Sequence, residues 1–117
     1  MSINELPLLE GARVPLASDP LTEIEAAALA HVFKALADPV RLRLFSLIAS
    51  RAGGEASVLD LAAHFDVTQP TISHHLKVLR ESGLIDSERR GTSIYSRVRP
   101  QALAQLAMLL MPGEAAS

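Results

Sequence analysis

Cysteine and tryptophan are both absent from this chain of 117 residues. Without thiols the protein can form no disulfide, hold no metal through thiolates and use no cysteine nucleophile or thiol redox sensor. Aromatic residues supply only 3% of a sequence that is 49% hydrophobic, so the core must be aliphatic, which favours helices. No apolar run is long enough to cross a bilayer, and the first residues lack the basic and apolar regions of a signal peptide. We therefore expect one cytoplasmic domain with no membrane segment.

The formal net charge of -2 argues weakly against a nucleic-acid partner, but the charge is unevenly distributed. Residues 1–66 hold five Lys and Arg against nine Asp and Glu, whereas residues 67–117 hold six against four. Local sign matters more than the total for attraction to phosphates. The basic part of the chain is therefore the better candidate for contact with a nucleic acid.

The most specific local pattern lies at residues 68–83, T-Q-P-T-I-S-H-H-L-K-V-L-R-E-S-G. Thr68 is predicted to cap a helix, Pro70 suits its first turn, and Gly83 suits the position after its end. Its apolar face would consist of Ile72, Leu76, Val78 and Leu79. Its opposite face would consist of Gln69, Thr71, Ser73, His74 and Lys77. This polar face suits a DNA major groove, although the stretch alone is also typical of a surface helix in a small bundle.

Start signals elsewhere predict further helices at residues 22–36, 39–51, 58–65 and 101–111. A capping box joins Thr22 and Glu25, and Asp38 caps the second helix. Ser57 precedes the short third helix, and Pro100 opens the last one. The domain is expected to span residues 22–111, between an extended arm at 1–21 and a frayed tail at 112–117.

Beyond Gly83 the apolar period changes towards two, which predicts strands at 84–88 and 93–98. Residues 89–92, R-R-G-T, would form the loop of this hairpin. Arg89 and Arg90 at an exposed tip repel each other unless an anion is near. Phosphate contact is the favoured interpretation after a helix-turn-helix, and a solubilising turn is the alternative.

The predicted order is four helices, a hairpin and a fifth helix. A short helix, a tight turn and a helix with a polar face make a helix-turn-helix. The expected fold is therefore mainly α with a small β-hairpin (α+β), a winged helix-turn-helix with extra helices at both ends. The first and last helices are too apolar to remain exposed, so we expect them to join two copies in a homodimer.

Three linked motifs occur in order: F-K-A-L-A-D-P-V-R-L-R-L at 33–44, Q-P-T-I-S-H-H-L-K-V-L-R at 69–80 and G-L-I-D-S-E-R-R-G-T-S-I-Y-S-R-V at 83–98. Together they closely resemble the ArsR/SmtB family of bacterial winged-helix repressors, over about residues 15 to 111. The resemblance implies a homodimer joined by its first and last helices. Such a dimer would bind an inverted-repeat operator in double-stranded DNA and repress transcription until an inducer releases it.

By the same resemblance, DNA contacts would come from the exposed face of the recognition helix. They carry over onto Gln69, Thr71, Ser73 and His74, with Lys77 as a phosphate contact and Arg89 and Arg90 at the wing tip. The chemistry agrees, because glutamine pairs with adenine, hydroxyls and imidazole reach bases or phosphate, and arginine neutralises phosphate. His75 lies one step round the helix and is expected to be a structural histidine.

The sequence departs from the resemblance at the inducer site. The arsenic-sensing branch carries cysteine pairs in the arm and in the third helix, where this chain has Ala12, Arg13, Ser57 and Leu59. None of these is a soft ligand for trivalent arsenic. The family's alternative zinc site uses Asp and His on the last helix, and residues 101–111 contain neither. We therefore expect no metal site and no cofactor, and the inducer is unknown.

The leading hypothesis is a sequence-specific repressor whose inducer is not a thiol-coordinated metal. The alternatives are a divergent metal-sensor homologue that responds to a small molecule, or a protein-interaction module without DNA binding. An enzyme is not expected. Ser73 and His74 are adjacent, and successive side chains of a helix diverge by about 100°, so they form no catalytic dyad.

Overall fold

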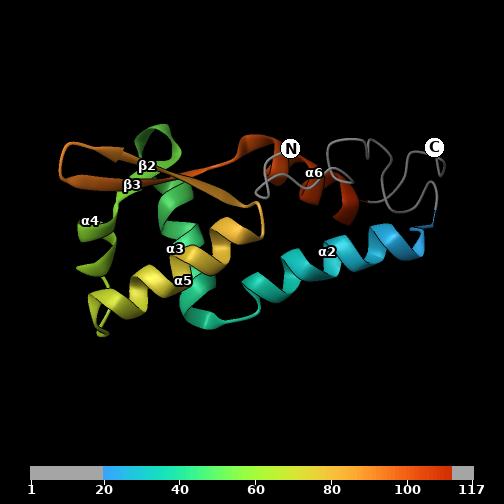
Figure 1. The fold of residues 1–117 in the computed structure, drawn as a ribbon. Helices are drawn as coiled ribbons and strands as arrows, with labels where there is room; N and C mark the ends of the chain where they lie inside the picture. Colours follow the sequence, from blue (N-terminus) through green and yellow to red (C-terminus); the bar gives the residue numbers. More distant parts are fainter. Residues whose placement is uncertain (1–19, 112–117) are drawn as a thin grey trace.

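Residues 20–111 are described by the computed structural model (Figure 1). The helices are α2 (Glu23–Leu36), α3 (Pro39–Ser50), α4 (Val58–Ala62), α5 (Gln69–Glu81) and α6 (Pro100–Leu110), with a 3-10 turn η1 at Ala52–Gly54. The strands are β1 (Glu55–Ser57), β2 (Ile85–Arg90) and β3 (Ser93–Val98). The expected extended arm lies outside the described residues apart from positions 20 and 21, and the expected frayed tail at 112–117 lies wholly outside them.

Side-chain caps start four of the helices, as the sequence indicates. At α2 the reciprocal capping box is present: Glu25 N donates to Thr22 Oγ1 at 3.2 Å, and Thr22 N donates to Glu25 Oε1 at 2.9 Å. Asp38, Ser57 and Thr68 each accept a hydrogen bond from the backbone N–H three residues on. These bonds satisfy N–H groups that have no partner within the helix. The predicted N-caps are therefore confirmed.

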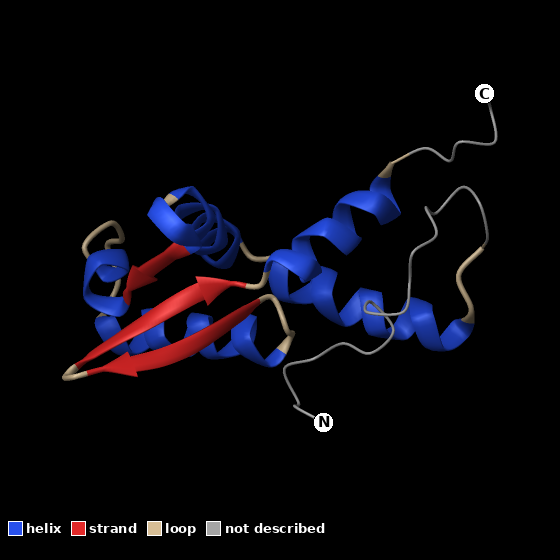
Figure 2. Cartoon of the chain, turned by 90° about the horizontal axis from the view of Figure 1, so that it is seen from above, coloured by secondary structure: helices blue, strands red, loops and turns tan. Residues whose placement is uncertain are grey.

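A single aliphatic core joins all the helices to the sheet. It includes Leu29 and Val32 of α2, Leu44 and Ile48 of α3, Leu61 of α4, Ile72, Leu76 and Leu79 of α5, Ile85 and Val98 of the sheet, and Leu106 of α6. Figures 1 and 2 show the hairpin and α4 at one end of the molecule and the outer parts of α2 and α6 at the other. The core therefore connects two ends that expose different side chains.

The sheet has three strands in the order β1-β3-β2, not the two expected. β1 pairs antiparallel with β3 through Glu55 opposite Arg97 and Ser57 opposite Tyr95. A strand of three residues is too short to show a period of two, so the sequence pattern did not reveal it. Its position matters, because β1 runs directly into α4.

The predicted helix at 58–65 is wrong at its C-terminal end, since α4 stops at Ala62. His64 Nδ1 lies 2.9 Å from the Asp60 carbonyl oxygen, the acceptor that the His64 backbone N–H would use in a continued α-helix. The His64 N–H bonds to Leu61 O instead, and Phe65 N bonds to Ala62 O. A side-chain donor thus competes for the helix acceptor and tightens the turn before α5.

The predicted hairpin loop at 89–92 is also wrong in its extent. β2 continues through Arg90, and only Gly91 and Thr92 form the turn. Gly91 has φ 64°, a left-handed conformation that favours glycine in such two-residue turns. Both arginines therefore belong to a strand, which fixes the sides of the hairpin on which they lie.

No helix among residues 20–111 is long and apolar enough to span a bilayer.

Candidate nucleic-acid interface

Helix α5 presents the polar face that the sequence indicated. Ile72, Leu76 and Leu79 are buried, and they anchor the helix against the core. The exposed residues include all five predicted ones, Gln69, Thr71, Ser73, His74 and Lys77, together with Pro70 and Glu81. Together with its packing against α3 and α4, this division makes α5 a fixed helix with one polar side facing solvent.

Both ends of α5 are closed by hydrogen bonds. At the start, Thr68 Oγ1 accepts from Thr71 N at 3.3 Å and lies 2.9 Å from Thr71 Oγ1. At the end, Gly83 has φ 87°, and Leu84 N donates to Leu79 O at 3.2 Å. This second bond belongs to the Schellman arrangement that stops a helix. Thr71 therefore shares its hydroxyl with the cap, while the exposed residues that follow it in α5 are held by a complete helix.

The two neighbouring histidines of α5 have different surroundings. His74 is exposed, and its ring centroid lies 5.9 Å from that of His75. His75 is half-buried, and its Nδ1 accepts from the Arg41 guanidinium at 3.2 Å. Arg41 is held in turn by its Nε, which donates to Ala35 O at 2.6 Å. His75 thus links α5 to α3 and the end of α2, whereas His74 faces outward.

Arg89 and Arg90 lie on opposite faces of the hairpin, because successive strand residues alternate. Arg89 pairs with Ile94, on the face whose Ser87, Ile94 and Ser96 adjoin Ser73 of α5 across a narrow hollow. Arg90 shares the outer face with Glu88 and Tyr95. Only the first of the two arginines is therefore on the side of the sheet that faces α5.

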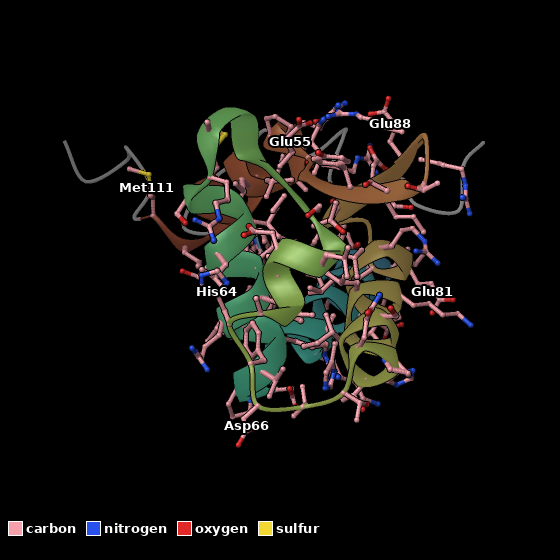
Figure 3. The ribbon with its side chains drawn as sticks, turned by 90° about the vertical axis from the view of Figure 1, so that its left-hand side faces the viewer. Glu55, His64, Asp66, Glu81, Glu88 and Met111 are labelled. Atoms are coloured by element: carbon pink, nitrogen blue, oxygen red, sulfur yellow. The ribbon has the colours of Figure 1, made fainter. Side chains whose placement is uncertain are left out.

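The outer face of the sheet carries a cluster of four charges, Glu55, Glu88, Arg90 and Arg97. Hydrogen bonds from Arg90, which has the larger effect, and from Arg97 lower the pKa of Glu55 to about 2. The pKa of Glu88 is also lowered, chiefly by its bond from Arg90, and the pKa of Arg90 is raised by the two carboxylates. Figure 3 shows Glu55 and Glu88 on the side of the sheet away from α4 and α5.

A shallow cleft of about 180 Å³ separates the start of α5 from the hairpin turn. It is lined by Gln69 and Ser73 of α5, by Thr92, Ser93 and Ile94 of the hairpin, and by Ser57, Val58 and Leu59 of α4. The hydroxyls of Thr92 and Ser93 were not among the predicted site residues. In the sequence, the one signal for these two residues is that they follow the wing arginines. Hydroxyl residues are common in turns, so this signal is weak.

Within residues 20–111 no three side chains of His, Cys, Asp or Glu come close enough to hold a metal ion. The position where the arsenic-sensing resemblance has its helix thiols is occupied by Ser57, the α4 cap, and by Leu59, which is 65% exposed. The corresponding arm residues, Ala12 and Arg13, lie outside the described residues. The described donor set therefore does not fit a metal.

The family model of a helix-turn-helix domain matches residues 36–88. The chain is 38% identical over 107 residues to the biofilm growth-associated repressor of Agrobacterium fabrum (strain C58), covering 89% of this chain and 86% of that protein. It is 39% identical over 80 residues to the arsenical resistance operon repressor of Escherichia coli (strain K12), covering 68% and 67%.

Among solved structures, the chain resembles a homodimeric winged helix-turn-helix DNA-binding domain from Mycobacterium bovis, described as a possible ArsR-family transcriptional regulator. The identity is 31% and the TM-score 0.58, over 76% of this chain and 88% of that domain. The repressor relatives, the winged helix-turn-helix fold and the three sequence motifs therefore all indicate the same family.

Proposed function

This chain belongs to the ArsR/SmtB family of winged helix-turn-helix regulators, and on that premise we propose that it is a homodimeric transcriptional repressor of double-stranded operator DNA. The observation that carries the proposal is the division of α5 into a buried apolar side and an exposed side whose first two turns hold only neutral hydrogen-bonding groups, Gln69, Thr71, Ser73 and His74, with the exposed charges Lys77 and Glu81 confined to the later turns. A surface helix that served only solubility would carry paired Glu and Lys there. No catalytic role is assigned, and the expected place of action is the cytoplasm.

The proposed DNA contacts follow the placement of the side chains. Gln69, Ser73 and His74 would meet base edges or phosphates, because they are exposed on the outward side of α5. Thr71 would contact phosphate through a hydroxyl that also serves the cap. Lys77 and Arg89 would supply the positive charge that attracts the duplex. Arg90, the other predicted wing contact, is paired with Glu55 and Glu88 on the outer face of the sheet.

A dimer would cover the apolar surface at the opposite end of the molecule. The exposed large hydrophobic side chains of that end are Leu21 just before α2, Ile24 and Phe33 along α2, Leu103, Met108 and Leu110 along α6, and Met111 just after α6. Figures 1 and 2 show these two helices extending beyond the DNA-facing part of the domain at the same end. A self-complementary contact there would hold two α5 helices in fixed relation, as an inverted-repeat operator requires.

The proposed inducer is not a metal held by thiolates. The chain contains no cysteine, so the soft ligands that trivalent arsenic needs are absent from every position, including 12, 13, 57 and 59. The proposed protein thus keeps the DNA-binding fold of the family but responds to an inducer of a different chemical class.

The proposal can be tested with a pool of duplexes randomised in sequence and selected by repeated binding to the full-length protein. The selection should enrich one inverted repeat, and its half-sites should be about one helical turn apart. Gln69→Ala and Ser73→Ala should then lose discrimination at particular base pairs, at a cost of about 1–3 kcal/mol per contact.

Gln101→Ala is the matched control, because Gln101 is an exposed glutamine at the start of α6, away from the proposed DNA interface. It should leave the selected sequence and the affinity unchanged. A selection that enriches no sequence would reject sequence-specific binding. A uniform loss of affinity in the α5 variants would show that these residues only position the helix.

A further inference from the structure

The two wing arginines are adjacent in sequence and yet have different environments. Among residues 20–111, Arg89 forms no ion pair, and its side chain lies on the sheet face that adjoins α5. Arg90 donates to Glu55 through both terminal nitrogens, NH1 to Oε2 at 2.8 Å and NH2 to Oε1 at 2.8 Å. It is also bonded to Glu88 at 2.9 Å. An interpretation of both residues as equivalent tip cations does not fit this geometry.

The Arg90 side chain lies back along the outer face of the sheet. Its guanidinium carbon is 4.4 Å from the centroid of the Tyr95 ring, and its partner Glu55 stands opposite Arg97 in the pairing of β1 with β3. The guanidinium is thus directed away from the hairpin turn, although Arg90 is the last residue of β2. A phosphate at the turn would have to draw it off an aromatic ring and two carboxylates.

Arg97 completes the cluster from β3. Its NH2 donates to Glu55 Oε1 and to Glu88 Oε1, both at 3.0 Å, and its Nε donates to Glu55 Oε1 at 3.1 Å. Two guanidinium groups and two carboxylates thus neutralise one another. A single exposed ion pair stabilises a protein little, but a two-pronged arginine contact within a network fixes geometry.

The cluster ties the wing to the helix-turn-helix at one residue. Glu55 is the only one of the four charges outside the hairpin, and it stands two positions before Ser57, the residue that caps α4. Without the Glu55 carboxylate, the pairing of the hairpin with β1 would rest on the short backbone ladder and on the burial of Ala56 in the core. The Glu55 carboxylate therefore bridges the far strand of the wing, β2, to the start of α4.

We propose that Glu55 is a positioning residue for DNA binding, which acts through Arg90 to hold the wing so that Arg89 faces the duplex. In this assignment Arg89 makes the phosphate contact and Arg90 makes none. The inference rests on the proposed function, and it refines it by dividing the roles of the two arginines. Holding the wing before DNA arrives removes part of the ordering cost of binding.

The test compares Arg89→Ala, Arg90→Ala, Glu55→Gln and the double variant Glu55→Gln/Arg90→Ala. Fluorescence anisotropy on the selected operator would give the dissociation constant over a series of salt concentrations. Arg89→Ala and Arg90→Ala are matched controls for each other, because they remove the same charge from adjacent positions. Thermal unfolding of each variant would establish that the affinities are measured on folded protein.

Arg89→Ala should lower the slope of log affinity against log salt by about 0.9 per protomer, or about 1.8 for a dimer. Arg90→Ala and Glu55→Gln should leave that slope unchanged and weaken binding by roughly two- to tenfold, which corresponds to the ordering of one long side chain. The double variant should bind no worse than Arg90→Ala, since both changes release the same link.

Other outcomes would overturn the assignment. A lower slope for Arg90→Ala would show that Arg90 contacts phosphate. Tighter binding by Glu55→Gln would show that Glu55 withholds a cation from the DNA. Unchanged affinity in both variants, with only a lower unfolding temperature, would reduce the cluster to a stabilising role. Failure of the wild-type protein to bind any selected duplex would instead reject the proposed function itself.

Discussion

The two ends of this molecule expose different mixtures of side chains from one shared core, although the end that carries α4, α5 and the hairpin also exposes single apolar residues such as Leu59 and Ile94. At the end formed by α4, α5 and the hairpin, the outward positions hold hydroxyls, an amide, an imidazole and arginines. At the end formed by α2 and α6, they hold aliphatic and sulfur-containing side chains such as Ile24, 72% exposed, and Leu110, 67% exposed. The first surface suits a hydrated, charged partner, and the second suits an apolar one.

The comparison shows that the outward residues of a helix, and not its buried stripe, determine which partner the helix can bind. α5 and α6 both bury a stripe of aliphatic residues in the same core: Ile72, Leu76 and Leu79 in α5, and Ala102, Leu106 and Leu109 in α6. Their outward residues alone distinguish a surface that would read DNA from one that would pair with a second copy. Changes confined to outward positions should therefore separate the two roles.

The largest effect is expected from Leu110→Glu. A charge at this exposed apolar position of α6 should break the proposed dimer without emptying the core. Loss of the second α5 helix should lower operator affinity by about 10²–10⁴, the gain that linking two binding sites provides. Sedimentation would give the oligomeric state, and anisotropy on full and half operators would give the affinities.

Leu42→Glu is the control for that experiment, because Leu42 is 52% exposed on α3. It should leave the dimer intact. Half-operator binding by Leu110→Glu should equal that of the wild-type protein. A variant that stays dimeric, or that loses half-operator binding as well, would contradict the separation of the two ends.

A smaller effect is expected from the two threonine caps. Thr68→Ala and Thr22→Ala each remove a side-chain bond to a helix N-terminus, so each should lower the free energy of unfolding by about 1 kcal/mol. Only the first starts the recognition helix, so only Thr68→Ala should also weaken DNA binding per dimer. Urea unfolding and operator titration of both variants check this, and equal losses of affinity would mean that the caps act through overall stability.

The predictable part of this fold was the part encoded by local signals. The caps at Thr22, Asp38, Ser57 and Thr68 were readable because each bond spans three residues. The buried stripe of α5 was readable from its period. The end of α4 was not, because it depends on whether the His64 ring or the backbone N–H takes the Asp60 carbonyl.

The candidate site was predictable in its helix and only partly in its wing. The face of α5 follows from helical spacing, but the roles of the arginines depend on where β2 ends. Once Arg89 and Arg90 lie in one strand, alternation separates them. Glu55 had no local signal at all, because its bonded partners Arg90 and Arg97 lie 35 and 42 residues further along the chain. Long-range ion pairs of this kind are visible only once the sheet has formed.

The smallest effect is expected on the stability of the protein at acid pH, and it arises from the charged cluster on the wing. The bonds from Arg90 and Arg97 lower the pKa of Glu55 from 4.5 to about 2 in the folded protein. A lowered pKa in the folded state means that the stabilisation is complete above pH 4.5 and is lost as the pH falls towards 2.

The midpoint of urea unfolding of the wild-type protein should therefore move to a lower urea concentration as the pH falls through this window, and the midpoint of Glu55→Gln should move less. The lowered pKa values of Asp38 and Glu88 contribute acid sensitivity to both proteins, so the difference between them isolates the contribution of Glu55. Identical shifts in the two proteins would mean that solvent screens the Glu55 ion pairs, and that the hairpin is held by its backbone ladder and its core packing.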